Sequence, residues 1–381
     1  MGVGNVARQG IGAVAGIWDD ARYHAKLRLG LVSPPILLPY RGYASGGRVR
    51  FGGRGVEDEG VVGAERSRSR WTQLWRTFRR YETDEIRDAV VEWRVGDVRG
   101  TAVTDKQGFF AIETAVDTAS VEGPWLTAEL ILRSAPGFRF EPMRRELFVR
   151  VVGTDAEFGI VSDLDDTLVE TGAQNFLKHL RTVAPNSAEG RVAFPGVAFL
   201  FRALASGRTG PNTNPVFYVS SSPWNLHELF EDFMELRGIP HGPMFLKDFG
   251  LNKTQWLTGS HRTHKLAAID RILDAYPGRF VLVGDTGQSD AAIYAETVRT
   301  HSGRILAVYL RDVSPGGFRS GVREAMEAIG AAGVSVTTGQ TLEPAARHAE
   351  DAGLVPSGTV DRMADEVARD FERRAPRPGF A

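Results

Sequence analysis

Short apolar runs alternate with helical patterns from Phe158 onward, and this alternation limits the possible folds more than any other feature. The helical patterns space apolar residues three and four positions apart, as in 224–237 and 265–276. Strands that are apolar on both faces and separated by helices form a parallel sheet covered on each side. The runs are FGIV (158–161), VFYV (216–219), MFL (244–246), RFVLV (279–283) and RILAVYL (304–310). They predict a parallel α/β sheet, and residues 314–381 add a helix, the strand VSVTT and another helix.

The preceding part of the chain has the pattern of β structure. From about Ile36 to Val152, short runs are bounded by glycine and aspartate turn residues, and TDKQGFFAIE is similar to a turn and strand of transthyretin-like modules. The predicted fold is a small antiparallel sandwich. We therefore expect a helical segment at 1–34, a β-sandwich-like domain at 35–153, an α/β domain at 154–355, and a helix and tail at 356–381.

Length and charge agree with this division. A chain of 381 residues exceeds one typical core. Its net charge of −1 provides no field that would attract nucleic acid, and its lack of cysteine is typical of a reducing compartment. No apolar run reaches the roughly 20 residues of a membrane helix, and the N-terminus lacks a secretory signal. We expect a cytoplasmic protein that binds no nucleic acid and whose only membrane contact would be peripheral.

Carboxylates follow two of the apolar runs directly. Asp163, Asp165 and Asp166 lie within four positions, and so many like charges beside a core are costly unless a cation compensates them. Asp285 and Asp290 follow the run at 279–283. Ligands bind at the carboxyl ends of parallel strands, and magnesium prefers oxygen ligands. The pattern predicts a Mg²⁺ site at this edge. The alternative is that the first cluster forms an Asx turn that caps the next helix.

Four motifs, in sequence order, resemble those of the haloacid dehalogenase superfamily of phosphohydrolases. DLDDT (163–167) is similar to its first motif, Ser220 to the second, Lys265 to the third and GDTGQSD (284–290) to the fourth. Within it, YVSSSPWNL, GPMFLKDFG and HKLAAI, behind a β domain with PYRGY, resemble the actin-patch-protein type of phosphatidate phosphatase catalytic domain. The resemblance covers 158–313 and implies a Rossmann-like core with a minimal cap. It also implies conversion of phosphatidate to diacylglycerol, a reaction of lipid metabolism.

The resemblance implies a catalytic role for five residues. Asp163 would attack phosphorus and form an aspartyl phosphate, and Asp165 would act as general acid and then general base. Ser220 and Lys265 would bind the phosphoryl oxygens. Thr167 would hold the loop of the first motif.

The resemblance also assigns the metal ligands. Asp163, Asp285 and Asp290 would hold Mg²⁺ together with the backbone carbonyl of Asp165, so that the cation screens nucleophile from phosphate. Asp166 fills a variable position and has no assigned chemistry.

Other residues could fill two of these roles. The rivals of Ser220 are Ser221 and Ser222, and the rivals of Lys265 are Lys247 and Lys253. His261 and His264 form an H-x-x-H pair without a third nearby zinc ligand, so we expect them to be solvent-exposed.

The spacing of the motifs leaves no room for a large cap domain. Thr167 and Ser220 are 53 positions apart, and Ser220 and Lys265 are 45 apart, which leaves space for only a modest flap at 175–196. An open site favours a phosphate carried on something large, such as a membrane surface or a macromolecule.

A basic, tryptophan-rich segment at 66–81 is the best candidate for membrane contact. RSRSRWTQLWRTFRRY forms an aromatic stripe surrounded by arginines, as in helices that lie in an anionic interface. Alternatively, the stripe packs on the β domain and the arginines are merely solvated. The first 30 residues are a second candidate.

Three functional hypotheses remain open at this point. The leading one is a Mg²⁺-dependent hydrolase of phosphatidate or a similar lipid phosphomonoester. The second is the same chemistry on a soluble or protein-borne phosphoester. The third is a catalytically inert protein that is recruited to membranes. Retention of both aspartates of DLD argues against the third.

Overall fold

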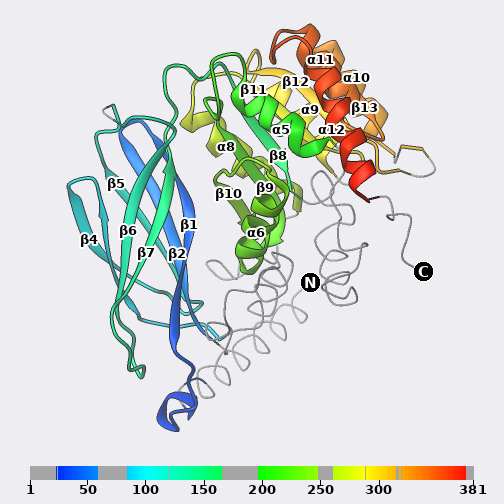
Figure 1. The fold of residues 1–381 in the computed structure, drawn as a ribbon. Helices are drawn as coiled ribbons and strands as arrows, with labels where there is room; N and C mark the ends of the chain where they lie inside the picture. Colours follow the sequence, from blue (N-terminus) through cyan, green and yellow to red (C-terminus); the bar gives the residue numbers. More distant parts are fainter. Residues whose placement is uncertain are drawn as a thin grey trace, which may run out of the picture.

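Among the residues that it describes, the computed structural model contains two sheets, one formed before residue 151 and the other after residue 158 (Figure 1). It describes residues 23, 25–58, 84–119, 121–164, 196–247, 261–287, 289–314, 317–318 and 320–374. Within these residues, no helix is both long and apolar enough to cross a bilayer. The order of its helices and strands makes it a mixed α/β protein in which a β-rich part precedes a parallel sheet.

The first sheet has seven strands in the order β4-β3-β6-β7-β1-β2-β5. All neighbours are antiparallel except β1 and β7, which are joined in parallel through two register pairs beside a bulge in β1. A Cβ at Gly42 in this bulge would overlap the Arg50 carbonyl oxygen, so the position requires glycine. The strands are β1 (Pro35–Ser45), β2 (Arg48–Glu57), β3 (Val90–Val95), β4 (Val98–Val103), β5 (Phe109–Ala115), β6 (Trp125–Ser134) and β7 (Met143–Arg150).

The strands of this sheet share one hydrophobic core. Phe51 and Ile112 from the β1-β2-β5 half pack in the same cluster as Leu130 and Leu147 from the β4-β3-β6-β7 half. The sequence predicted a sandwich of antiparallel strands. The strands are indeed antiparallel within each half, but the bulge in β1 lets it pair with β7, and hydrogen bonding continues through all seven strands.

The second sheet is parallel throughout, in the order β10-β9-β8-β11-β12-β13. Each apolar run predicted from the sequence is one of its strands, and VSVTT is the edge strand β13. The strands are β8 (Gly159–Asp163), β9 (Val216–Pro223), β10 (Met244–Lys247), β11 (Phe280–Asp285), β12 (Ile305–Arg311) and β13 (Ser335–Gly339).

Helices cover both faces of the parallel sheet, as the apolar strands predicted. One core contains side chains of α5, α6, α11 and α12, and the other contains those of α8, α9 and α10. Full burial of each large apolar side chain, such as Ile269 of α8, contributes about 1.5–3 kcal/mol. The helices are α5 (Val197–Ser206), α6 (His227–Arg237), α8 (His261–Ala275), α9 (Asp290–Thr300), α10 (Val322–Ala331), α11 (Glu343–Asp351) and α12 (Thr359–Arg374).

The β-rich part packs closely against the parallel sheet through β1. Tyr43 joins the core of α8 and lies 5.6 Å, centroid to centroid, from the ring of Phe245. Tyr40 lies 4.4 Å from the ring of His227, at the start of α6. The Arg41 guanidinium donates to both carboxylate oxygens of Glu231. The β-rich part and the parallel sheet therefore share an interface that contains buried aromatic rings and a partly buried ion pair.

Acid should weaken this interface through His227. Burial lowers the pKa of His227 from 6.5 to about 4. The unfolded chain therefore binds a proton at a pH where the folded one does not, so lowering the pH favours unfolding. We expect the titration of His227 to make the free energy of unfolding about 2 kcal/mol lower at about pH 5 than at about pH 7.

Urea unfolding of wild type and His227→Phe at both pH values would check this expectation. Phenylalanine keeps a ring beside Tyr40 but cannot titrate, so the variant should lose most of the pH dependence. The neighbouring Glu231 cannot mimic the effect, because its pKa is lowered to about 2 and it titrates in a more acidic window. An unchanged pH dependence in the variant would contradict the assignment.

Candidate active site

Two aspartates end neighbouring strands at the centre of the parallel sheet. Asp163 is the last residue of β8 and Asp285 is the last residue of β11. The two strands are paired in register, with Val283 opposite Ser162, so both carboxyl ends reach the same edge. Both aspartates are buried, Asp163 at 2% exposure and Asp285 at 0%. Two carboxylates therefore meet where parallel sheets bind ligands.

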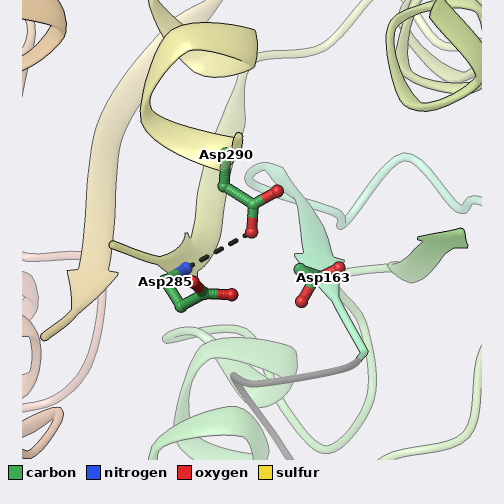
Figure 2. A group of neighbouring side chains, drawn as sticks. All are labelled: Asp163, Asp285 and Asp290. Carbon is green, nitrogen blue, oxygen red and sulfur yellow. Dashed lines mark hydrogen bonds between the residues drawn. The ribbon is translucent and has the colours of Figure 1, made fainter. Parts of the chain in front are cut away.

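A third carboxylate comes from the first residue of α9. Asp290 is buried, and its Oδ2 accepts a hydrogen bond from the backbone N–H of Asp285 at 3.3 Å (Figure 2). Oxygens of Asp163, Asp285 and Asp290 lie within 4.8 Å of one another. The structure thus brings together three of the acids to which the sequence assigned a metal.

Lys265 on α8 provides a cation beside this cluster. Its Nζ lies 2.6 Å from Asp163 Oδ1 and 2.7 Å from Asp290 Oδ1, and the residue is only 4% exposed. Burial alone would lower the pKa of the Lys265 ammonium, but the two carboxylates outweigh it and raise that pKa well above its usual range. Lys265 is therefore protonated and links two of the acids.

Ser220 lies in β9, which pairs with β8 on the side opposite to β11. Val219 is paired with Asp163, so Ser220 is the next residue toward the carboxyl edge of the sheet. Its side chain is buried, and its Oγ accepts a hydrogen bond from the backbone N–H of Ser222 at 2.8 Å. Its rivals Ser221 and Ser222 follow within the same strand.

Gly284 has a structural role that the sequence reasoning missed. A Cβ at this position would lie 2.8 Å from Asp290 Oδ2 and 2.8 Å from the Tyr294 ring. Glycine therefore lets the Asp290 carboxylate approach the end of β11. The sequence signal that could have indicated this role is the glycine directly before Asp285 in GDTGQSD.

Several predicted site residues lie outside the described part of the chain. They are Asp165, Asp166, Thr167, the flap at 175–196 except its last residue Gly196, Lys253 and the basic segment 66–81. The rival Lys247 ends β10 and is half-buried. His264 is also half-buried, and burial lowers its pKa, which disagrees with the expected solvent exposure.

The carboxylate cluster suits a hard divalent cation. Three buried carboxylates offer oxygen ligands within reach of one ion, and Lys265, which contacts two of them, carries one positive charge. Magnesium commonly takes one or two carboxylates, waters and a phosphate oxygen. The donor set therefore fits the metal that the sequence predicted.

Comparisons with known proteins point to the same segment. Residues 158–312 match the family model "Phosphatidate phosphatase APP1, catalytic domain". The phosphatidate phosphatase APP1 of Saccharomyces cerevisiae is 31% identical over 155 residues, which is 40% of this chain and 25% of that protein. An uncharacterized protein of Schizosaccharomyces pombe is 24% identical over 265 residues, which is 68% of this chain and 39% of that protein.

Similarity among solved structures is weaker. A carbohydrate acetylesterase from Xanthomonas citri aligns over 88% of this chain and 74% of its own, at 10% identity and a TM-score of 0.31, which is too low to bear on the fold. The chain spans well under half the length of the two fungal relatives. The family match contains β8 to β12 with all three clustered aspartates, Ser220 and Lys265. Residues 158–312 of the chain are therefore similar to the family of the phosphatidate phosphatase APP1 catalytic domain.

Proposed function

We propose that the chain is a Mg²⁺-dependent phosphoric monoester hydrolase of the haloacid dehalogenase type. One observation carries the proposal. Asp163, Asp285 and Asp290 converge at a strand edge with Lys265 between two of them, inside the segment that matches the phosphatase family. A cation beside grouped carboxylates is an arrangement that suits phosphoryl transfer, because charge on phosphate must be balanced while it moves.

Asp163 is the proposed nucleophile. One of its carboxylate oxygens forms a bond to phosphorus as the bond from phosphorus to the leaving oxygen breaks, which gives an aspartyl phosphate and an alcohol. Water then attacks the phosphorus, releases phosphate and restores the carboxylate. Division into two displacements lowers the barrier of each step.

Asp165 is the proposed proton carrier for both steps. As an acid it would donate a proton to the leaving alkoxide, and as a base it would take one from the attacking water. Its position two residues after Asp163 in DLD supports this role. Thr167 would hold the same loop.

Lys265 and Ser220 are proposed to bind the phosphoryl oxygens. The Lys265 ammonium already lies at hydrogen-bond distance from Asp163, so a phosphate at that carboxylate would be within its reach. Ser220 approaches from the neighbouring strand and can donate its hydroxyl proton. Both groups would stabilise negative charge on the equatorial oxygens during transfer.

Asp163, Asp285 and Asp290 would hold the metal, with the Asp165 carbonyl as a further ligand. The ion would neutralise phosphate charge and so permit attack by an anion. The Lys265 ammonium contacts both Asp163 and Asp290, so it would help to hold their carboxylates in place for the metal.

The proposed substrate is phosphatidate or a similar lipid phosphomonoester. The support is the name of the yeast relative, which is a phosphatidate phosphatase, together with the absence of room for a large cap between the motifs. A peripheral contact with an anionic membrane and a cytoplasmic location remain predictions of this proposal. An open site admits a headgroup that stays attached to a bilayer.

Phosphate release with and without metal tests the proposal. The purified chain should release phosphate from phosphatidate in mixed micelles when Mg²⁺ is present. Chelation with EDTA should lower the rate by at least about 100-fold, because several kcal/mol of charge stabilisation are lost. Excess Mg²⁺ should restore the rate.

A panel of soluble phosphoesters, assayed in parallel, tests the proposed lipid substrate separately from the proposed phosphatase reaction. Faster turnover of a soluble ester than of phosphatidate would refute the lipid substrate but keep the phosphatase. No metal-dependent phosphate release from any ester would refute the phosphatase itself.

A further inference from the structure

Arg54 of the β-rich part reaches across the interface to the end of the catalytic strand β9. Its Nη1 donates to Asn225 Oδ1 at 2.6 Å. Asn225 lies in the short 3₁₀ turn Trp224–Leu226, which directly follows β9. Arg54 is only 5% exposed, so this is a largely buried polar link from one half of the protein to the other.

The Arg54 guanidinium is held from several directions at once. Its Nε donates to the Gln107 carbonyl oxygen at 2.9 Å and its Nη2 to Glu85 at 3.0 Å. Its central carbon lies 4.7 Å from the centroid of the Phe109 ring. A planar fork with fixed donors can meet three acceptors in this way, whereas a lysine ammonium cannot reproduce the geometry. The β-rich part therefore presents a rigid donor to Asn225.

A second contact holds the same turn. The ring of Tyr40 stacks on Trp224 at 4.7 Å between ring centroids, with an interplanar angle of 26°. Offset stacking of this kind favours one relative placement of the rings. The turn after β9 is thus held by β1 through Trp224 and by β2 through Asn225.

This turn is continuous with the proposed phosphate-binding strand. Ser220 is five residues before Asn225, and its Oγ accepts a hydrogen bond from the N–H of Ser222. Only Ser221, Ser222 and Pro223 separate Ser220 from the stacked Trp224. A shift of the turn would therefore move the Ser220 hydroxyl relative to Asp163 on the neighbouring strand.

We propose that Arg54 is a positioning residue for the catalytic site, and that the β-rich part aligns Ser220 with Asp163 through the contacts of Arg54 with Asn225 and of Tyr40 with Trp224. The expected effect of Arg54 on turnover rests on the proposed function, whereas its expected effect on the turn Trp224–Leu226 does not. It gives the β-rich part a direct role in the chemistry of the matched segment. It also gives Trp224 and Asn225 of the SSPWN stretch a role as an interface rather than as substrate contacts.

The test compares Arg54→Met with Arg48→Met. Both residues lie in β2 and both bond to an acidic side chain, but Arg48 pairs with Glu113 on the exposed face of the sheet. We expect Arg54→Met to lower kcat on a soluble phosphoester by about 10-fold to 100-fold with a smaller change in KM, because misplaced groups weaken the transition state most. Arg48→Met should stay within about twofold of wild type.

Two further variants separate positioning from loss of stability. Arg54→Lys keeps the charge but not the fork, so it should lose nearly as much kcat as Arg54→Met. Asn225→Ala should lower kcat too, and its combination with Arg54→Met should be no slower than Arg54→Met alone if the two act through one bond. Equal losses in Arg48→Met, or full kcat in folded Arg54→Met, would overturn the proposal.

Hydrogen–deuterium exchange provides a readout that does not depend on activity. Peptides that cover 216–226 should exchange faster in Arg54→Met than in wild type or Arg48→Met, at a urea concentration where all three are folded. Unchanged exchange in these peptides would overturn the positioning role even if the chain proves to have no phosphatase activity. Faster exchange without any wild-type turnover would refute only the proposed function.

Discussion

Asp163→Asn should abolish phosphate release, with a loss on the order of 10⁴-fold or more. The carboxamide has the same shape as the carboxylate, but its oxygen carries too little negative charge to attack phosphorus. The variant should fold, because it removes one of three clustered negative charges and leaves Lys265 paired with Asp290. Initial rates of phosphate release, with circular dichroism to confirm folding, provide the measurement.

The control for Asp163→Asn is Asp274→Asn. Asp274 is an exposed aspartate on α8, so its replacement changes the net charge equally without touching the cluster. Its rate should match wild type. A titration with Mg²⁺ separates two roles of Asp163. If excess Mg²⁺ restores turnover to Asp163→Asn, then Asp163 serves only as a metal ligand and the assigned nucleophile is wrong.

Lys265→Met should be the second large effect, and it should act on both activity and stability. Without the ammonium, Asp163 and Asp290 are buried side by side without their shared cation. Removal of one partner from a buried ion pair costs about 3–5 kcal/mol. Loss of a charged group from the proposed phosphate site should also lower kcat by about 10²-fold to 10³-fold.

Metal should partly compensate the stability loss of Lys265→Met but not its loss of activity. A divalent cation would neutralise the same carboxylates, so Mg²⁺ should raise the thermal midpoint of the variant more than that of wild type. Thermal unfolding in EDTA and in Mg²⁺ measures this difference. Lys247→Met is the matched variant at the rival lysine and should have little effect. A larger loss of activity in Lys247→Met than in Lys265→Met would reverse the assignment.

The parallel sheet could be predicted from the sequence because its determinants are local. Each strand of β8 to β12 is a short run of apolar residues, and α6 ends at Arg237, directly before Gly238, whose φ of +66° is costly for other residues. Acids that directly follow an apolar strand must lie at its carboxyl end. That rule alone is enough to place Asp163 and Asp285 at one edge of the sheet.

Other features depended on contacts between distant residues. Lys265 was expected to bind phosphate, but its contact with two aspartates, 102 and 25 positions away, appears only when α8 packs beside β8 and α9. The continuous seven-stranded sheet depends on the pairing of Gly42 with Val149, which no local pattern encodes. Gly284 is needed because Asp290 folds back over it.

The amino-acid sequence by itself determined which residues end the parallel strands, because hydrophobic periodicity and turn residues act over a few positions. Only the tertiary structure decided that Lys265 lies between Asp163 and Asp290, and that Arg54 meets Asn225 across 171 positions. Such contacts arise when whole helices and sheets pack to bury their apolar faces. That packing, rather than the neighbours in the chain, then decides which polar side chains meet.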